Sequence, residues 1–148
     1  MNLLRTDSSH SDFIYLVAML DAYLAISDGA DHGFYAQFNK IDLIKNVVLA
    51  YEENHVLGCG AFKIYEGKTV EIKRMFCRPE SRRKGVVGLI LQNLEEWAKA
   101  SSHEKCILET GKKQVEAIAL YRKAGYGQIA NYGQYSGIEA SLCFEKHL

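Results

Sequence analysis

Hydrophobic residues recur at three- and four-residue intervals in three stretches of the chain, a spacing typical of amphipathic helices. The first stretch follows Ser11 and Asp12, either of which can cap a helix, and the others span Val86–Ala100 and 114–124. Gly125 directly follows the third stretch and favours a helix end there, because glycine readily adopts the left-handed conformation found beyond helix ends. The pattern therefore predicts three helices.

Stretches rich in Val, Ile and aromatic residues lie between and after these helices and favour β-strands. Residues 46–51, 55–65 and Thr69–Cys77 are separated by short polar turns and predict an antiparallel meander. Shorter strands are expected at residues 105–109, 126–130 and 141–145. With an opening strand ahead of the first helix, this order predicts a mixed α/β sheet.

The segment that joins the first helix to the meander has no clear pattern. Residues 27–33 combine Ser, Asp and Gly and are expected to end the helix. Residues 34–44 fit a short helix and an irregular loop equally well, so the pattern leaves both open.

Composition and charge narrow the class of protein. The 148 residues predict a single domain over residues 1–148, and a 48% hydrophobic, 24% charged chain is ordinary globular usage. Lys and Arg number 18, as do Asp and Glu, whereas nucleic-acid binders usually carry a basic surplus. No apolar run approaches the ~18–20 residues that span a bilayer, and no signal peptide is visible. We therefore expect a cytoplasmic protein that binds neither nucleic acid nor membrane.

The cysteines give no sign of metal or disulfide chemistry. Cys59, Cys77, Cys106 and Cys143 lack the C-x-x-C spacing, and no pair of histidines has ligand spacing, so no metal site is expected. All of these cysteines lie in apolar stretches, which favours buried, reduced thiols over a nucleophile such as Cys59 paired with His55.

A basic turn between the third strand of the meander and the second helix is the most informative segment. Basic side chains crowd into this part of the neutral chain at Lys73, Arg74, Arg78, Arg82, Arg83 and Lys84. The N–H groups at a helix start have no partners within the helix and favour anions, and Gly85 allows close approach to the backbone. A diphosphate fits this turn, and a solvated turn is the plainer alternative. The spacing departs from the nucleotide P-loop, the dinucleotide-binding turn and the KH loop.

Two motifs resemble a known family. The run RRKGVV at 82–87 resembles the R/Q-x-x-G-x-G/A pyrophosphate loop of the GNAT superfamily of N-acetyltransferases. The run QVEAIALYRKAGY at 114–126 resembles that superfamily's second signature, N-x-x-A-x-x-L-Y-x-x-x-G-F. The resemblance implies the acyl-CoA N-acyltransferase fold, with a central, mostly antiparallel sheet flanked by helices, and acetyl-CoA as the cofactor. Its implied contacts are Met75, Phe76 and Cys77 for the pantetheine arm, Arg82, Arg83, Lys84, Gly85, Val86, Val87 and Gly88 for the pyrophosphate, and Gln114 and Tyr121.

Two positions depart from the family pattern. Val87 stands where the family has Gly or Ala, and its branched side chain is expected to push the pyrophosphate outward, with Gly88 as a source of compensating space. Gln114 stands where the family usually has Asn, and its side chain is one methylene longer.

The resemblance also implies an acid and a base for transfer of an acetyl group to a primary amine. Tyr121 corresponds to the tyrosine that protonates the departing thiolate, and its alternative role is that of a core residue on an amphipathic helix. Glu71 resembles the strand carboxylate that serves as base, and its alternative is a surface carboxylate paired with Lys73. Glu109 is the second candidate for the base, or an anchor for the cationic amine.

The acceptor is the least defined part of the expected reaction. Aromatic residues that could wall its pocket, unless they are core or turn residues, are Phe34, Tyr35, Tyr132 and Tyr135. With Glu71 and Glu109 they would suit a small cationic amine or an amino-acid-like compound, and a peptide is also possible. The protein is expected to be a monomer or a homodimer. The alternative function is a non-catalytic acyl-CoA-binding or sensing domain of the same fold.

Overall fold

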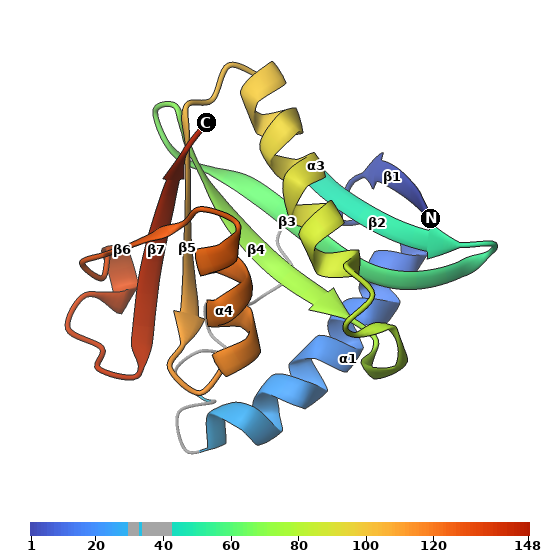
Figure 1. Cartoon of the computed structure of the whole chain (residues 1–148), viewed down its shortest axis with the longest axis horizontal. Helices are drawn as coiled ribbons and strands as arrows, with labels where there is room; N and C mark the ends of the chain where they lie inside the picture. Colours follow the sequence, from blue (N-terminus) through green and yellow to red (C-terminus); the bar gives the residue numbers. More distant parts are fainter. Residues whose placement is uncertain (30–32, 34–42) are drawn as a thin grey trace.

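The computed structural model describes residues 1–29, 33 and 43–148. In this part of the chain, one seven-stranded sheet has the order β1-β2-β3-β4-β5-β7-β6 (Figure 1). The strands are β1 (Asn2–Thr6), β2 (Asn46–Glu52), β3 (His55–Glu66), β4 (Thr69–Cys77), β5 (Lys105–Gly111), β6 (Gly127–Ile129) and β7 (Ser141–His147). The helices are α1 (Ser11–Asp28), α3 (Val86–Ala100) and α4 (Val115–Lys123), with short 3₁₀ turns η2 (Pro79–Ser81) and η3 (Gly133–Tyr135).

Helices cover both faces of the sheet because its central strands are apolar on both sides. Along β2, Val47 and Leu49 pack in the cluster that contains the buried face of α1. Val48 and Ala50 alternate with them and pack in the cluster that contains α3 and Tyr121 of α4. The sheet therefore separates α1 from α3 and α4, as Figure 1 shows.

The sheet is antiparallel except where β4 meets β5, and there it opens. These two strands pair in parallel only through residues 69–71 and 105–107. Beyond this point β4 runs on to Cys77 and β5 to Gly111 with no further ladder between them. The mixed, mostly antiparallel sheet expected from the sequence is confirmed, and the diverging strands create the place where the functional site lies.

A β-bulge on β4 shapes the backbone at this opening. Phe76 pairs with Cys59 and Lys73 with Ala61, so two residues of β4 face Gly60 alone. Arg74, one of the two, has a left-handed backbone with φ of 59°. Met75 fills the space above Gly60, where a Cβ atom would collide with its Sδ.

Arg74 belongs to the basic run in the sequence but not to the basic turn in the structure. Its side chain is only 4% exposed and its guanidinium donates to Asp21 Oδ1 of α1 at 2.7 Å. Its backbone oxygen accepts a hydrogen bond from the Cys59 thiol at 3.3 Å. The side chain therefore ties the bulge to α1.

The expected helices and the antiparallel meander are confirmed, and the differences lie at element ends. The first helix ends at Asp28, within residues 27–33, as expected. The strand expected at 105–109 extends to Gly111, whereas the one expected at 126–130 is limited to Gly127–Ile129. None of the helices described is long and apolar enough to cross a membrane.

Candidate active site

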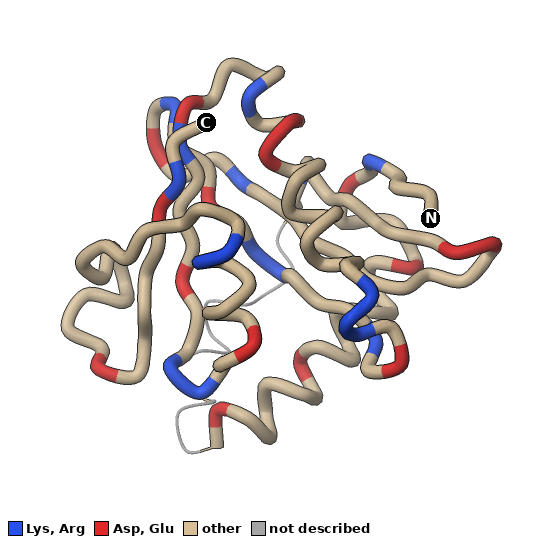
Figure 2. The backbone as a smooth tube through the Cα atoms, in the orientation of Figure 1, with Lys and Arg blue, Asp and Glu red and all other residues tan. Residues whose placement is uncertain are grey.

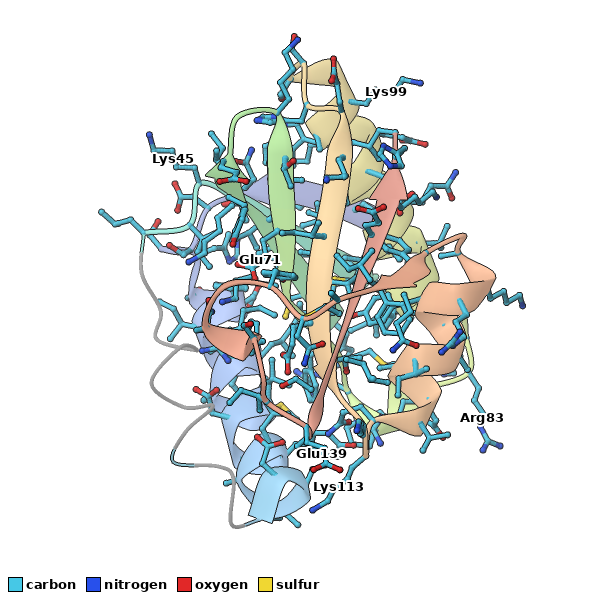
Figure 3. The ribbon with its side chains drawn as sticks, turned by 90° about the vertical axis from the view of Figure 1, so that its left-hand side faces the viewer. Lys45, Glu71, Arg83, Lys99, Lys113 and Glu139 are labelled. Carbon is cyan, nitrogen blue, oxygen red and sulfur yellow. The ribbon has the colours of Figure 1, made fainter. Side chains whose placement is uncertain are left out.

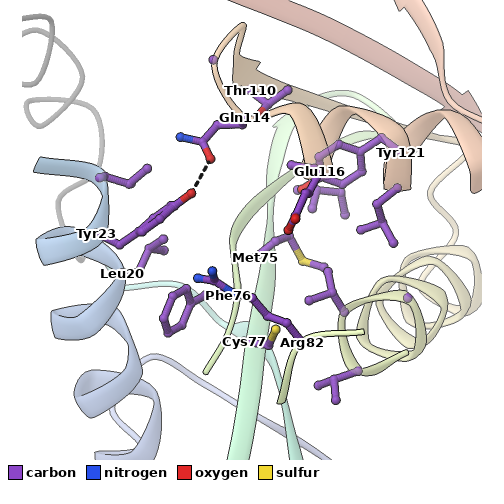
Figure 4. Close-up of a pocket in the computed structure, with 18 of the residues that line it drawn as sticks. Leu20, Tyr23, Met75, Phe76, Cys77, Arg82, Thr110, Gln114, Glu116 and Tyr121 are labelled. Carbon is purple, nitrogen blue, oxygen red and sulfur yellow. Dashed lines mark hydrogen bonds between the residues drawn. The ribbon is translucent and has the colours of Figure 1, made fainter. Parts of the chain in front are cut away.

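A cavity of about 380 Å³ occupies the space between the diverging strands (Figure 4). Its walls come from α1, from β4 and β5, from the turn before α3, and from α4. It brings together these residues expected from the sequence to contact a cofactor: Met75, Phe76, Cys77, Arg82, Arg83, Gly85, Val86, Val87, Gly88, Gln114 and Tyr121. Lys84 is exposed and does not line it.

One end of the cavity suits an anion. Gly85 caps α3 in a left-handed conformation with φ of 77°, and the N–H groups of the first helical turn are left without helical acceptors. Arg82 and Arg83 line the same end, and Figure 2 shows the basic residues gathered in this turn. The helix dipole and the two guanidinium groups together favour a diphosphate here.

Val87, the departure from the family loop, occupies part of the anion-binding end of the cavity, while the neighbouring position 88 leaves space open. Val87 is half-buried and lines the cavity. Gly88 lines it too, and the nearest atom to a Cβ placed there would be Leu120 Cδ1 at 4.0 Å. Free space therefore adjoins Val87 at the next position of the helix.

A hydrogen-bonded bridge crosses the cavity between α1 and the start of α4. Gln114 Oε1 accepts from the Tyr23 hydroxyl at 3.2 Å, the dashed line of Figure 4. Its Nε2 donates to Ser27 Oγ at 2.6 Å. The Arg82 guanidinium lies over the Tyr23 ring, 5.3 Å from its centroid. The longer amide that replaces the family's Asn is thus held by α1.

Glu109 places a carboxyl group at the other end of the cavity. Its Oε2 is buried and has no hydrogen-bond partner in the described part of the chain. Burial raises the pKa of Glu109 to about 7, and the charges of Asp28 and Glu71 raise it too, against a hydrogen bond from Ser141 and the charge of Lys73. A carboxyl with this pKa exchanges a proton readily near neutral pH.

Tyr121 lies on the α4 wall of the same cavity. The side chain is buried, and burial together with the charge of Glu109 raises the pKa of its phenol above the ordinary value. The phenol is therefore protonated at neutral pH and is available as a proton donor. Its ring meets that of Tyr126 edge-on at 5.9 Å.

Glu71 is buried behind the cavity instead of facing solvent. Its Oε2 accepts a hydrogen bond from the Tyr132 hydroxyl at 2.7 Å, and its Oε1 lies 3.8 Å from Lys73 Nζ. Lys73 lines the cavity, whereas Glu71 does not. Burial lowers the pKa of Lys73, against the charge of Glu71, which raises it. In Figure 3, Glu71 lies beside the segment between β6 and β7, far from Arg83.

The expected acceptor residues are placed only in part. Tyr132 lies in the segment between β6 and β7, and its ring meets Tyr65 at 5.3 Å and Tyr135 at 5.8 Å. Neither Tyr132 nor Tyr135 lines the cavity, and Phe34 and Tyr35 lie outside the described residues.

A second cavity of about 340 Å³ adjoins the first at Gln114 and is also lined by Lys113 and Glu139, labelled in Figure 3.

The four cysteines are free and buried, as expected. Burial raises the pKa of Cys59 to about 12, which makes its thiol a poor nucleophile. Among the residues described, no group of three or more His, Cys, Asp or Glu could hold a metal ion.

Comparison with known proteins decides the family. Residues 14–126, most of the chain and all of both motifs, match the acetyltransferase (GNAT) family. The chain belongs to this family. It is 38% identical over 102 residues to an IAA acetyltransferase of Azospirillum brasilense, covering 68% of this chain and 67% of that protein.

Solved GNAT structures share the whole fold. A Klebsiella pneumoniae protein provisionally described as an acyl-CoA N-acyltransferase has a TM-score of 0.83 and 25% identity, covering 99% of this chain and 97% of that one. A GNAT acetyltransferase of Elizabethkingia anophelis, solved with acetyl-CoA bound, has a TM-score of 0.69 and 17% identity, covering 99% and 97%. The expected GNAT fold, acetyltransferase class and cofactor are thereby confirmed at the level of the family.

The GNAT motifs did not reveal every residue of this site. Tyr23 and Leu20 reach the cavity from α1, outside both motifs, and in the sequence they are only hydrophobic positions of the first expected helix. In the sequence, Lys73 is recognisable only as a member of the basic run and as a possible partner for Glu71. Strand alternation puts Lys73 on the face of Glu71, and this signal could have placed it in the acceptor site.

Proposed function

We propose that this chain transfers an acetyl group from acetyl-CoA to the primary amine of a small molecule, with an amino-acid-like compound as the favoured acceptor. The observation that supports it best is the cavity between β4 and β5, which has a basic helix start at one end and Glu109 with Tyr121 at the other. A bound acetyl-CoA supplies the thioester carbon that the amine attacks.

The residues around the cavity fit this cofactor. The N–H groups at the start of α3, with Arg82 and Arg83, would bind the pyrophosphate. The unpaired edge of β4 at Met75, Phe76 and Cys77 would lie along the pantetheine arm, with backbone N–H near Phe76 for the oxyanion. Gln114 and Tyr23 would cover the arm from the side of α1.

Glu109 is the carboxylate best placed to take the proton from the amine. An alkyl amine with a pKa of ~10.4 is almost fully protonated at neutral pH, so a proton must leave before or during attack. Glu109 lines the cavity, has a buried oxygen without a hydrogen bond in the described structure, and has a pKa of about 7. Glu71, the base expected first from the sequence, lies behind the cavity wall, where it accepts a hydrogen bond from Tyr132 and pairs with Lys73. Its role as base stays a prediction that the variants below separate from that of Glu109.

Tyr121 would protonate the departing thiolate. A thiol with a pKa of ~8.5 is already a fair leaving group, so the gain from this proton is modest. We expect Tyr121→Phe to lower kcat by about ten- to a few hundred-fold, within the lower range of general acid catalysis.

Amine-dependent release of thiol from acetyl-CoA tests the proposed function. Purified protein is incubated with acetyl-CoA and a panel of small amines and peptides, and the freed thiol is measured. Tyr126→Phe is the matched control, because it removes the hydroxyl of a neighbouring buried ring that does not line the cavity. Thiol release that no amine accelerates would contradict the proposal, and turnover of peptides alone would contradict the small-molecule acceptor.

A further inference from the structure

The end of the cavity at Glu109 carries side chains of both charges. Lys73 of β4 and Glu109 of β5 both line it. Their neighbours Ile72 and Leu108 pack toward α3 and α4, so alternation turns Lys73 and Glu109 to the other face of the sheet. Each feels the charge of the other: Glu109 raises the pKa of Lys73, and Lys73 lowers that of Glu109. An acceptor with only a positive charge would lie near Lys73, and one with only a negative charge near Glu109, so either would be repelled by one side chain of this wall.

Lys73 is held at the wall by buried groups behind it. The Lys73 and Glu71 side chains are only 11% and 5% exposed, with Nζ and Oε1 3.8 Å apart. Tyr132 donates to the other oxygen of Glu71 and fixes that carboxylate. An ammonium group has three donors, so Lys73 can face Glu71 and a second anion at the same time.

Glu109 provides the complementary position for a cation. Its buried Oε2 accepts no hydrogen bond from the described residues. A buried carboxylate oxygen without a partner is unfavourable, and an amine of the acceptor would satisfy it.

From this arrangement we infer that the acceptor is an amine that also carries a carboxylate, with Lys73 binding the carboxylate and Glu109 facing the amine. Glu71 is then a positioning residue that orients Lys73. The inference rests on the proposed acetyl transfer and names the acceptor class of the same site.

Matched acceptors test it in the wild-type protein. The kcat/KM of thiol release is compared for leucine and phenylalanine, their amides, and the amines that lack the carboxyl group, with a series of amino acids of increasing amine-to-carboxyl separation. We expect the best acid to exceed its amide and its amine by about 10- to 100-fold, the range for a hydrogen bond to a charged group. The amino group of the amide has a lower pKa than that of the acid, so more of it is deprotonated at neutral pH. A preference for the acid therefore cannot come from a larger fraction of reactive amine.

Variants assign the preference to residues. Lys73→Met should reduce it to about threefold or less, mainly through KM of the acid, and Lys73→Arg should retain part of it. Glu71→Gln should raise KM for the acid and keep the acidic limb of the pH profile, moved toward lower pH because the charge of Glu71 raises the pKa of Glu109, whereas loss of the base would remove the limb. Lys68→Met is the matched control, because this lysine is 66% exposed and pairs with Glu104 away from the cavity.

The outcomes separate the inference from the proposed function. Equal or faster turnover of the amides or simple amines in the wild type would overturn the inference while leaving acetyl transfer intact. A preference for acids that survives in Lys73→Met would overturn the role of Lys73. No amine-dependent thiol release from any acceptor would overturn the proposed function, and the inference with it.

Discussion

At the scale of single residues, the environment of Glu109 sets the expected pH dependence of the reaction. The pKa of Glu109 is raised to about 7, and burial is the largest of the several causes. A base must be deprotonated to act, so kcat/KM should fall as the pH drops through about 7. Glu109→Gln should lower kcat/KM by about 10²–10⁴ and remove this limb of the pH profile.

The matched variant for this prediction is Glu71→Gln, which removes the other carboxylate on the same face of the sheet. It should keep the acidic limb that Glu109→Gln loses. If the limb disappears in Glu71→Gln and persists in Glu109→Gln, Glu71 is the base, as first expected from the sequence.

Val87 gives a second prediction at this scale. Its branched side chain lines the cavity at the helix start where the pyrophosphate would bind. We expect Val87→Gly to tighten the binding of coenzyme A by up to about tenfold, because it removes a side chain that competes for this space. Calorimetric titration of both proteins measures the change, and a weaker complex in the variant would show that Val87 contacts the cofactor favourably.

At the scale of elements, the bulge on β4 depends on one ion pair with α1. Arg74 holds a left-handed backbone, and its guanidinium is buried with Asp21 as its ionic partner. Asp21→Asn would leave a buried charge without compensation, and we expect it to destabilise the protein by about 2 kcal/mol, with a lower kcat/KM. Arg74→Gly removes that charge and adopts the left-handed backbone without steric cost.

The double variant Asp21→Asn/Arg74→Gly provides the control. It should be more stable than Asp21→Asn alone, as measured by denaturant unfolding, because no unpaired charge remains. Loss of stability equal to the sum of the two single variants would mean that the pair does not couple α1 to the bulge.

Element positions followed from local pattern, whereas element ends depended on tertiary contacts. The spacing of Leu91 and Leu94 in α3 and the continuous apolar run 47–50 in β2 are local sequence patterns that match the burial of these residues. At the end of the first helix, Ser27 accepts a hydrogen bond from Gln114, which is 87 residues away in the chain. The extra length of β5 comes from β7, where Ser141 pairs with Gly111.

The cofactor end of the site could be predicted from sequence, and the acceptor end only in part. The pyrophosphate loop is contiguous, so Arg82 to Gly88 could be recognised as one motif. Lys73 lies on β4 and Glu109 on the neighbouring β5, and Tyr132 reaches Glu71 from the segment between β6 and β7, so these residues come together only in the folded sheet. Bridges such as that from Tyr23 to Gln114 leave no local signal in the sequence.

At the scale of the whole molecule, the topology explains how a neutral chain gathers basic residues at one end of the site. Placing β5 parallel to β4 among antiparallel strands lets the two strands diverge after only three paired positions. The start of α3 then faces the opening, and the basic turn gathers there although Lys and Arg equal Asp and Glu over the chain (Figure 2). The expected single domain, cytoplasmic location, lack of nucleic-acid binding and monomeric or dimeric state stay predictions.

A calorimetric titration of the purified chain with acetyl-CoA, with free coenzyme A as comparison, tests most directly whether the opening between β4 and β5 is a cofactor site. We predict saturable binding of one equivalent with a micromolar Kd. Absence of binding at millimolar acetyl-CoA would contradict the account, because it would mean that the cavity between the strands does not admit the cofactor.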